Sequence, residues 1–228
     1  MNFIYDFPEK AFANKIISKN KIYSFANPSS KVKGFFVNQV EKIIWLYKLS
    51  PQTVNLPADG FVKEIQVFLI DLRENNLNPE VLKTIDKAIP SPIIFILKAN
   101  NKIRYVISYK RQSEADKLKW VISEYFFSPW MNENQQRQPL PVALNLKKLY
   151  EILIKNISPI SILPDEDMED FIARVEMIHI KQKEVERIRN KIRREKQFNR
   201  KVQMNTQLKK ISKEIEVLKY GQDKCFKQ

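Results

Sequence analysis

The 228-residue sequence is poor in the residues that build many catalytic and structural sites. It has one cysteine, Cys225, and one histidine, His179. A single cysteine excludes a disulfide within the chain and fits a reducing compartment, and one cysteine with one histidine is too few for a structural zinc site. The three glycines form neither a P-loop nor a dinucleotide-binding fingerprint. We therefore expect no zinc-stabilised fold and no nucleotide-dependent ATPase or dehydrogenase of those classes.

Long apolar runs are also missing. None reaches the roughly 18 residues that a membrane span needs, and no apolar leader-like region follows a basic start. A cytoplasmic protein without a membrane partner is the simplest expectation. The hydrophobic content of 43% nevertheless predicts a folded core.

Positive charge, in contrast, is abundant and unevenly placed. The formal net charge is +14, which points to an anionic partner such as nucleic acid or an acidic protein surface. The segment 181–213 holds 13 lysines and arginines against 3 acids, so it carries +10 of that total.

The stretch from Asp165 to Tyr220 lacks glycine and proline and is rich in good helix formers, which predicts one uninterrupted helix. Apolar residues recur there at the 3–4 spacing of a coiled-coil seam. The phase of this apolar spacing shifts near Ile188 and again between Ile192 and Met204. The sequence is therefore compatible both with a single straight helix and with a hairpin folded at 199–205. We predict a globular domain over 1–164, this coiled-coil-like arm over 165–221, and a tail over 222–228.

The preceding domain has the pattern of an α+β fold. Short helical turns are expected over residues 1–27. Asn-Asn after a strand favours a tight hairpin, and Asn-Pro favours the start of a helix. The sum is a mixed, mainly antiparallel sheet of about five strands with flanking helices. The predicted strands are 40–49, 61–72, 93–97, 103–109 and 117–127, and the predicted helices are 28–40, 78–89 and 144–157.

Within the arm, basic residues form a stripe that suits an anionic partner. Spacings of three and four residues place one set of cations on one helix face, and others flank it. Cations set against phosphates release counterions, so such a stripe binds nucleic acid with a steep salt dependence. An acidic protein surface and a merely solvated helix face are the alternatives. The candidate binding residues are Arg187, Arg189, Arg193, Arg194, Lys196, Arg200 and Lys201.

The second predicted strand offers a candidate catalytic site. Glu64 and Gln66 are two residues apart and so point to one face, which Lys48 on the preceding strand could share. A carboxylate followed two residues later by Lys or Gln resembles the metal-binding edge of restriction-type nuclease cores, where carboxylates hold Mg²⁺. The aspartate that this nuclease pattern places before the carboxylate is missing here. Glu64 and Gln66 also fit the solvent-exposed face of an ordinary strand. Mg²⁺ is expected only if the nuclease interpretation holds; otherwise we predict no metal and no cofactor.

Five segments of this chain together resemble the domain-of-unknown-function 4391 family. They are VEKIIWLYKLSPQTVNLP, VKEIQVF, IDKAIPSPIIFIL, LPVALNLKKLYE and KIRREKQFNRKVQMNTQLKKISKEI. The resemblance covers about residues 28–218, with these segments in the same order. The resemblance implies a short bacterial or archaeal protein encoded beside a DNA methyltransferase and a helicase, as in type III restriction and other anti-phage defence loci. It supplies no catalytic residues.

The main expectation is thus a non-catalytic accessory subunit of a restriction-modification-like or anti-phage defence system. It would dock on the helicase or methyltransferase and contact DNA or another nucleic acid through the basic arm. One alternative is a metal-dependent nuclease subunit that uses Glu64, Gln66 and Lys48. The other is a self-associating coiled-coil module, which would form a homo-oligomer through the arm.

Overall fold

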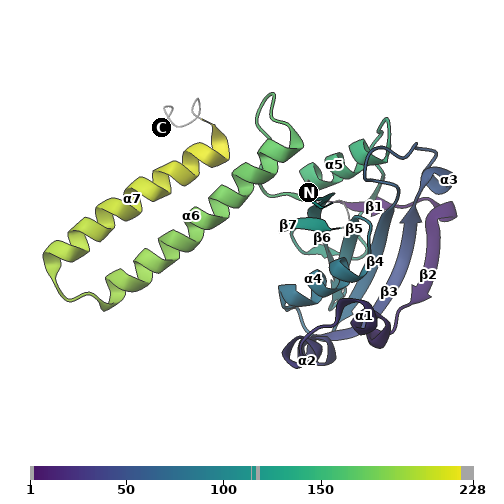
Figure 1. Cartoon of the computed structure of the whole chain (residues 1–228), viewed down its shortest axis with the longest axis horizontal. Coiled ribbons are helices and arrows are strands. Elements are labelled where there is room, and N and C mark those ends of the chain that lie inside the picture. The colour runs from purple at the N-terminus through teal and green to yellow at the C-terminus, as the bar shows by residue number, and fades with distance from the viewer. Residues whose placement is uncertain (1–2, 114, 117–118, 222–228) are drawn as a thin grey trace. The chain divides into compact units, whose positions relative to one another are not determined.

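The computed structural model describes residues 3–113, 115–116 and 119–221 (Figure 1). By its internal contacts the chain divides into two units, one up to Pro159 and one from Ile160 onward. Each has an apolar cluster of its own. None of the helices in the described ranges is long and apolar enough to cross a membrane. The predicted tail and its Cys225 lie outside the described residues.

A sheet of seven strands organises the first unit. The parallel pair lies at its centre, and the other neighbouring strands are antiparallel, so the predicted mixed sheet is confirmed with two more strands than expected. Helix α4 (Pro79–Ala88) connects the two parallel strands, β4 (Ile65–Leu72) and β5 (Ile93–Ala99). The strands lie in the order β2 (Phe12–Ile16), β3 (Val40–Leu49), β4 (Ile65–Leu72), β5 (Ile93–Ala99), β6 (Lys102–Gln112) and β7 (Trp120–Phe127), with β8 (Met131–Asn132) paired to β6.

Helices cover both faces of this sheet because its central strands are apolar on both sides. On one face, α1 (Lys19–Ala26), α2 (Ser30–Gln39) and α4 close over a cluster that includes Phe68 and Phe95. On the other face, α5 (Leu146–Ile157) packs against β6, where Tyr150 stacks on Tyr109 with ring centroids 6.2 Å apart.

Two local signals behave as the sequence predicts. Asn100 and Asn101 both have positive φ, 48° and 59°, and form the tight turn between β5 and β6. Asn78 caps α4 by accepting a hydrogen bond from the Glu80 amide at 3.0 Å, with Pro79 at the first helical position.

The prediction for residues 1–27 is partly wrong, because this stretch contains two strands besides helical turns. β1 (Ile4–Asp6) pairs in parallel with β9 (Arg137–Pro139), and β2 forms an edge of the main sheet after a 3₁₀ turn over Glu9–Ala11. β2 is mostly exposed on both faces, so its sequence has no alternation of apolar and polar residues to reveal it.

The second unit is a helical hairpin. α6 (Met168–Arg194) and α7 (Phe198–Tyr220) run antiparallel side by side (Figure 1). Ile178, Val185 and Ile188 of α6 pack against Ile211 and Ile215 of α7. The seam predicted from the sequence is therefore filled within the chain.

The expectation of one uninterrupted helix is wrong, because the backbone leaves the helix at residues 195–197. Glu195 is extended, with ψ 137°. Its carboxylate accepts hydrogen bonds from the amides of Lys196 at 2.8 Å and Gln197 at 2.9 Å, which lower its pKa. A side chain thus satisfies amides that the break leaves free, so neither glycine nor proline is needed. The turn lies a few residues before the 199–205 segment left open above.

Arg174 holds the base of the hairpin together. Its guanidinium donates to Glu166 Oε1 at 2.5 Å and Oε2 at 2.6 Å, and to the carbonyls of Ser161 at 2.9 Å and Leu218 at 2.7 Å. Partial burial opposes ionisation of Glu166, but its hydrogen bonds from Arg174 and from the Leu163 amide keep its pKa below the usual value. The segment before α6 and the end of α7 are thus linked through one side chain.

Candidate functional site

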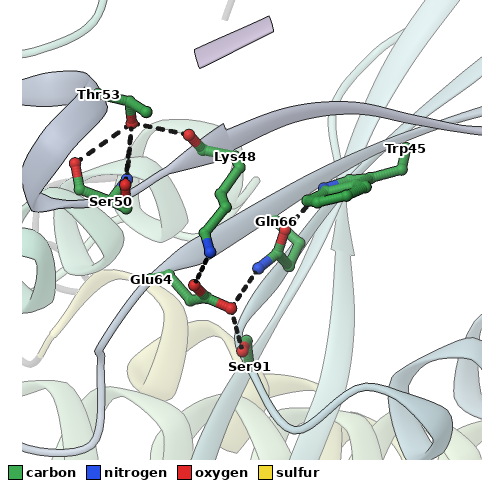
Figure 2. Close-up of polar contacts among 7 residues, drawn as sticks. All are labelled: Trp45, Lys48, Ser50, Thr53, Glu64, Gln66 and Ser91. Carbon is green, nitrogen blue, oxygen red and sulfur yellow. Dashed lines mark hydrogen bonds and ion pairs between the residues drawn. The ribbon is translucent and has the colours of Figure 1, made fainter. Parts of the chain in front are cut away.

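The structure brings Glu64, Gln66 and Lys48 together at one end of β3 and β4, as Figure 2 shows. Lys48 Nζ lies 2.6 Å from Glu64 Oε2, and the Gln66 amide nitrogen donates to Glu64 Oε1 at 2.7 Å. Ser91, just before β5, donates to the same oxygen at 3.4 Å. Glu64 directly precedes β4, and Lys48 is the cross-strand neighbour of Gln66.

Trp45 completes this group, which we name the Gln66 network: Trp45, Lys48, Glu64, Gln66 and Ser91. The Trp45 indole nitrogen donates to Gln66 Oε1 at 2.7 Å. An indole N–H can only donate and an ionised carboxylate can only accept, so these two neighbours fix which end of the Gln66 amide faces each of them. Sequence reasoning did not single out Trp45 as a member of this site, and the structure packs it against the core as well. Its position on the strand beside Gln66 was the available signal.

The position of Lys48 is set by the turn that ends β3. Thr53, in the short helix α3 (Pro51–Val54), donates its hydroxyl to the Lys48 carbonyl at 2.7 Å and accepts from the Ser50 amide at 2.9 Å (Figure 2). Ser50 and Thr53 therefore cap the helix and hold the end of the strand at once.

The network forms the polar side of a pocket of about 280 Å³, named here the Gln66 pocket. Most of its lining is apolar: Ile22 and Phe25 come from α1, and Ile89 follows α4. Gln66 is nearly buried, whereas Phe25 at the rim is 70% exposed. A polar group with a fixed orientation thus faces an apolar cavity, the usual composition of a small-molecule site.

The residues present do not fit a magnesium site. Glu64 is the carboxylate of the network, and Lys48 already neutralises it. A magnesium ion bound there would displace or face that ammonium group, and Mg²⁺ favours carboxylate and water oxygens free of such a competitor. Within the described residues, no group of three or more His, Cys, Asp or Glu side chains is arranged to hold a metal ion.

Behind the pocket wall lies a buried ion pair that the sequence did not reveal. Lys110 and Asp86 are each 1% exposed, with Lys110 Nζ 3.6 Å from Asp86 Oδ1. The ammonium also donates to the carbonyls of Asp86, at 2.6 Å, and of Ile89, at the end of α4. Burial raises the pKa of Asp86 to about 6, against the charge of Lys110 and a hydrogen bond from Tyr125.

The predicted basic residues gather where the two helices of the hairpin meet. We name residues 187–201 the basic tip; it contains eight lysines and arginines and one acid, Glu195. All eight are exposed except Lys201, which is half-buried. Among the described residues, ion pairs link Arg189 to Glu186 at 2.8 Å and Arg200 to Glu195 at 3.9 Å.

Phe198 lies within the basic tip and is 76% exposed. An exposed aromatic side chain among cations is typical of surfaces that combine phosphate contacts with base stacking. The hairpin brings cations from the end of α6 and the start of α7 to the same place, which a straight rod would spread along its length.

The fold and its two surfaces define a small α+β protein that carries a basic helical hairpin. The chain belongs to the family described as a domain of unknown function (DUF4391), whose sequence profile matches residues 5–215. The resemblance found in the sequence is thereby confirmed. No curated protein and no solved structure matches the chain significantly.

Proposed function

We propose that the protein is a non-catalytic accessory subunit that contacts nucleic acid through the basic tip. The observation that carries this proposal is the concentration of eight exposed or half-exposed cations against one acid within 187–201. Phosphates are the densest anionic surface such a tip can meet, and each contact releases a counterion. Exposed Phe198 adds an apolar contact of the kind that stacks on a base.

The partner we propose is a cytoplasmic helicase or DNA methyltransferase of a restriction-modification-like or anti-phage defence system. This part rests on the genetic setting that the family resemblance implies. The first unit would dock on the enzyme, and the coiled-coil-like hairpin would place its tip on nucleic acid. In such a complex the larger enzyme supplies the chemistry.

The test is DNA binding by the full chain across salt from about 50 to 300 mM. The change is the combined replacement of Arg189, Arg193, Arg194 and Arg200 by alanine. Each lost phosphate contact lowers the slope of log affinity against log salt by about 0.9 on a duplex, so we expect the slope to fall by about three to four.

The matched control removes the same charge elsewhere, with alanine at Lys10, Lys31, Lys63 and Lys87, all exposed in the first unit. This variant should keep nearly the whole slope. An unchanged slope in the tip variant, or an equal loss in both variants, would refute the assignment. Absence of DNA binding by the unaltered protein would instead assign the tip to an acidic protein surface.

A further inference from the structure

The Gln66 network retains hydrogen-bonding capacity that the described contacts do not use. Gln66 has one N–H and one lone pair on its oxygen beyond the bonds to Glu64 and Trp45. Lys48 has two further N–H donors besides the one directed at Glu64. A ligand in the Gln66 pocket therefore meets a donor and an acceptor side by side on one rigid amide.

The charge of the network limits the chemistry of that ligand. Because Glu64 and Lys48 neutralise each other, neither a bare cation nor a bare anion finds an unpaired charge there. A purely apolar chain would leave the buried polar edge of Gln66 without a partner. The complement is a neutral, flat ring with an apolar face and adjacent donor and acceptor groups on its edge.

From this match we propose that the Gln66 pocket binds a nucleobase. The side chain of Gln or Asn pairs in this bidentate way with adenine, whose edge carries an amino group beside a ring nitrogen. The pocket volume of about 280 Å³ is near the lower end for ligand sites, which suits one base rather than a dinucleotide.

The rim of the pocket fits the rest of a nucleotide. Phe25 offers an exposed ring on which a base can stack, and Lys21 also lines the pocket. A base that enters with its edge towards Gln66 would leave its sugar and phosphate at the opening, where the Lys21 ammonium can meet the phosphate. The base could belong to a free mononucleotide or to a single-stranded nucleic acid.

This inference does not rest on the basic tip, because the pocket lies in the first unit and the tip in the second. The experiment is calorimetric titration of the full chain with adenosine 5′-monophosphate, the other three common mononucleotides, and ribose 5-phosphate. A second arm uses short single-stranded oligonucleotides of one base. Saturation by mononucleotides identifies a free nucleotide as the source, and binding of oligonucleotides alone identifies a base within a strand.

Two variants test the site. Gln66→Met keeps the length of the side chain and removes both amide groups; we expect binding at least about tenfold weaker. Phe25→Ser removes the stacking ring at an exposed position, so folding is spared, and binding should fall by about tenfold or more. Phe12→Ser is the matched control, since Phe12 is another exposed phenylalanine, on β2, outside the pocket.

The proposal is overturned if neither mononucleotides nor oligonucleotides bind at the pocket. It is equally overturned if binding survives Phe25→Ser and Gln66→Met, or if ribose 5-phosphate binds as tightly as the nucleotides. The tip variant with four alanines must leave mononucleotide binding unchanged. Conversely, Phe25→Ser must leave the salt slope of duplex binding unchanged, so either proposal can fail without the other.

Discussion

Replacing Lys110 by methionine tests whether the buried ion pair supports α4, which forms one wall of the Gln66 pocket. Methionine fills a similar volume but removes the ammonium group, which contacts the Asp86 carboxylate and the carbonyls of Asp86 and Ile89. A cation near these carbonyls also interacts favourably with the negative, C-terminal end of the helix dipole. The variant thus leaves a buried carboxylate and two helix-end carbonyls without this partner.

The expected loss of stability depends on pH. Burial raises the pKa of Asp86 from 3.8 to about 6, so the folded state binds this proton more tightly than the unfolded state does. The contribution of Asp86 to stability therefore becomes less favourable as pH rises through this range. Without Lys110 the pKa of Asp86 rises further. The stability of the variant therefore continues to fall at pH values where that of the unaltered protein has levelled off.

At pH 5, Asp86 is mostly protonated in both proteins, so the variant should lose about 2 kcal/mol, chiefly for the two carbonyls. At pH 8 the unpaired carboxylate must either stay charged or take up a proton at a cost, and the loss should be about 4 kcal/mol. The difference between the two pH values is the diagnostic quantity.

The assay is urea unfolding followed by tryptophan fluorescence at pH 5 and pH 8. Lys102→Met, an exposed change on the same strand, is the control and should shift stability by less than about 0.5 kcal/mol. An equal loss at both pH values would show that the carboxylate is not the cause. A loss below about 1 kcal/mol at pH 8 would refute the reasoning altogether.

Three further outcomes follow from the contacts described above. Arg174→Met should destabilise the hairpin by about 3 kcal/mol, because it leaves the largely buried Glu166 carboxylate without its cationic partner; faster amide hydrogen exchange in α6 and α7, with the first unit unchanged, would be the readout. Asn101→Val should cost about 1–2 kcal/mol in urea unfolding, because a β-branched residue resists the positive φ of the turn, whereas Asn101→Gly should not destabilise. The full chain should be a monomer by light scattering at high concentration, because its helical seam is filled internally; a stable dimer would contradict this.

Much of the sheet could be predicted from the sequence because its signals are local. Asn100 and Asn101 require positive φ, and the run of apolar residues that follows Pro92 is too short for a helix and apolar on both faces. The two strands near the N-terminus were missed because a peripheral, exposed strand needs no apolar alternation. Their pairing depends on β3 and on β9, and β9 lies more than a hundred residues away.

The turn of the hairpin and the full site were beyond local signals. The break at Glu195 depends on the fit between the apolar faces of α6 and α7, which helix propensity does not contain. Glu64, Gln66 and Lys48 were predictable as neighbours from strand alternation. The hydrogen bond from Trp45 to Gln66 and the contribution of α1 to the pocket wall could not be predicted. Both depend on the tertiary packing of segments that are distant in sequence.

The length of α6 has a consequence for how the hairpin responds to ionic strength. At about 1.5 Å per residue, its base at Arg174 and its tip at Arg194 are roughly 30 Å apart. That span is several Debye lengths at physiological salt, where screening acts over about 8 Å, so the two ends do not sense each other's charge. The ion pair at the base is also largely buried, and salt screens it weakly. Added salt will therefore weaken the electrostatic attraction of the tip for an anionic partner while the arm that carries it stays folded.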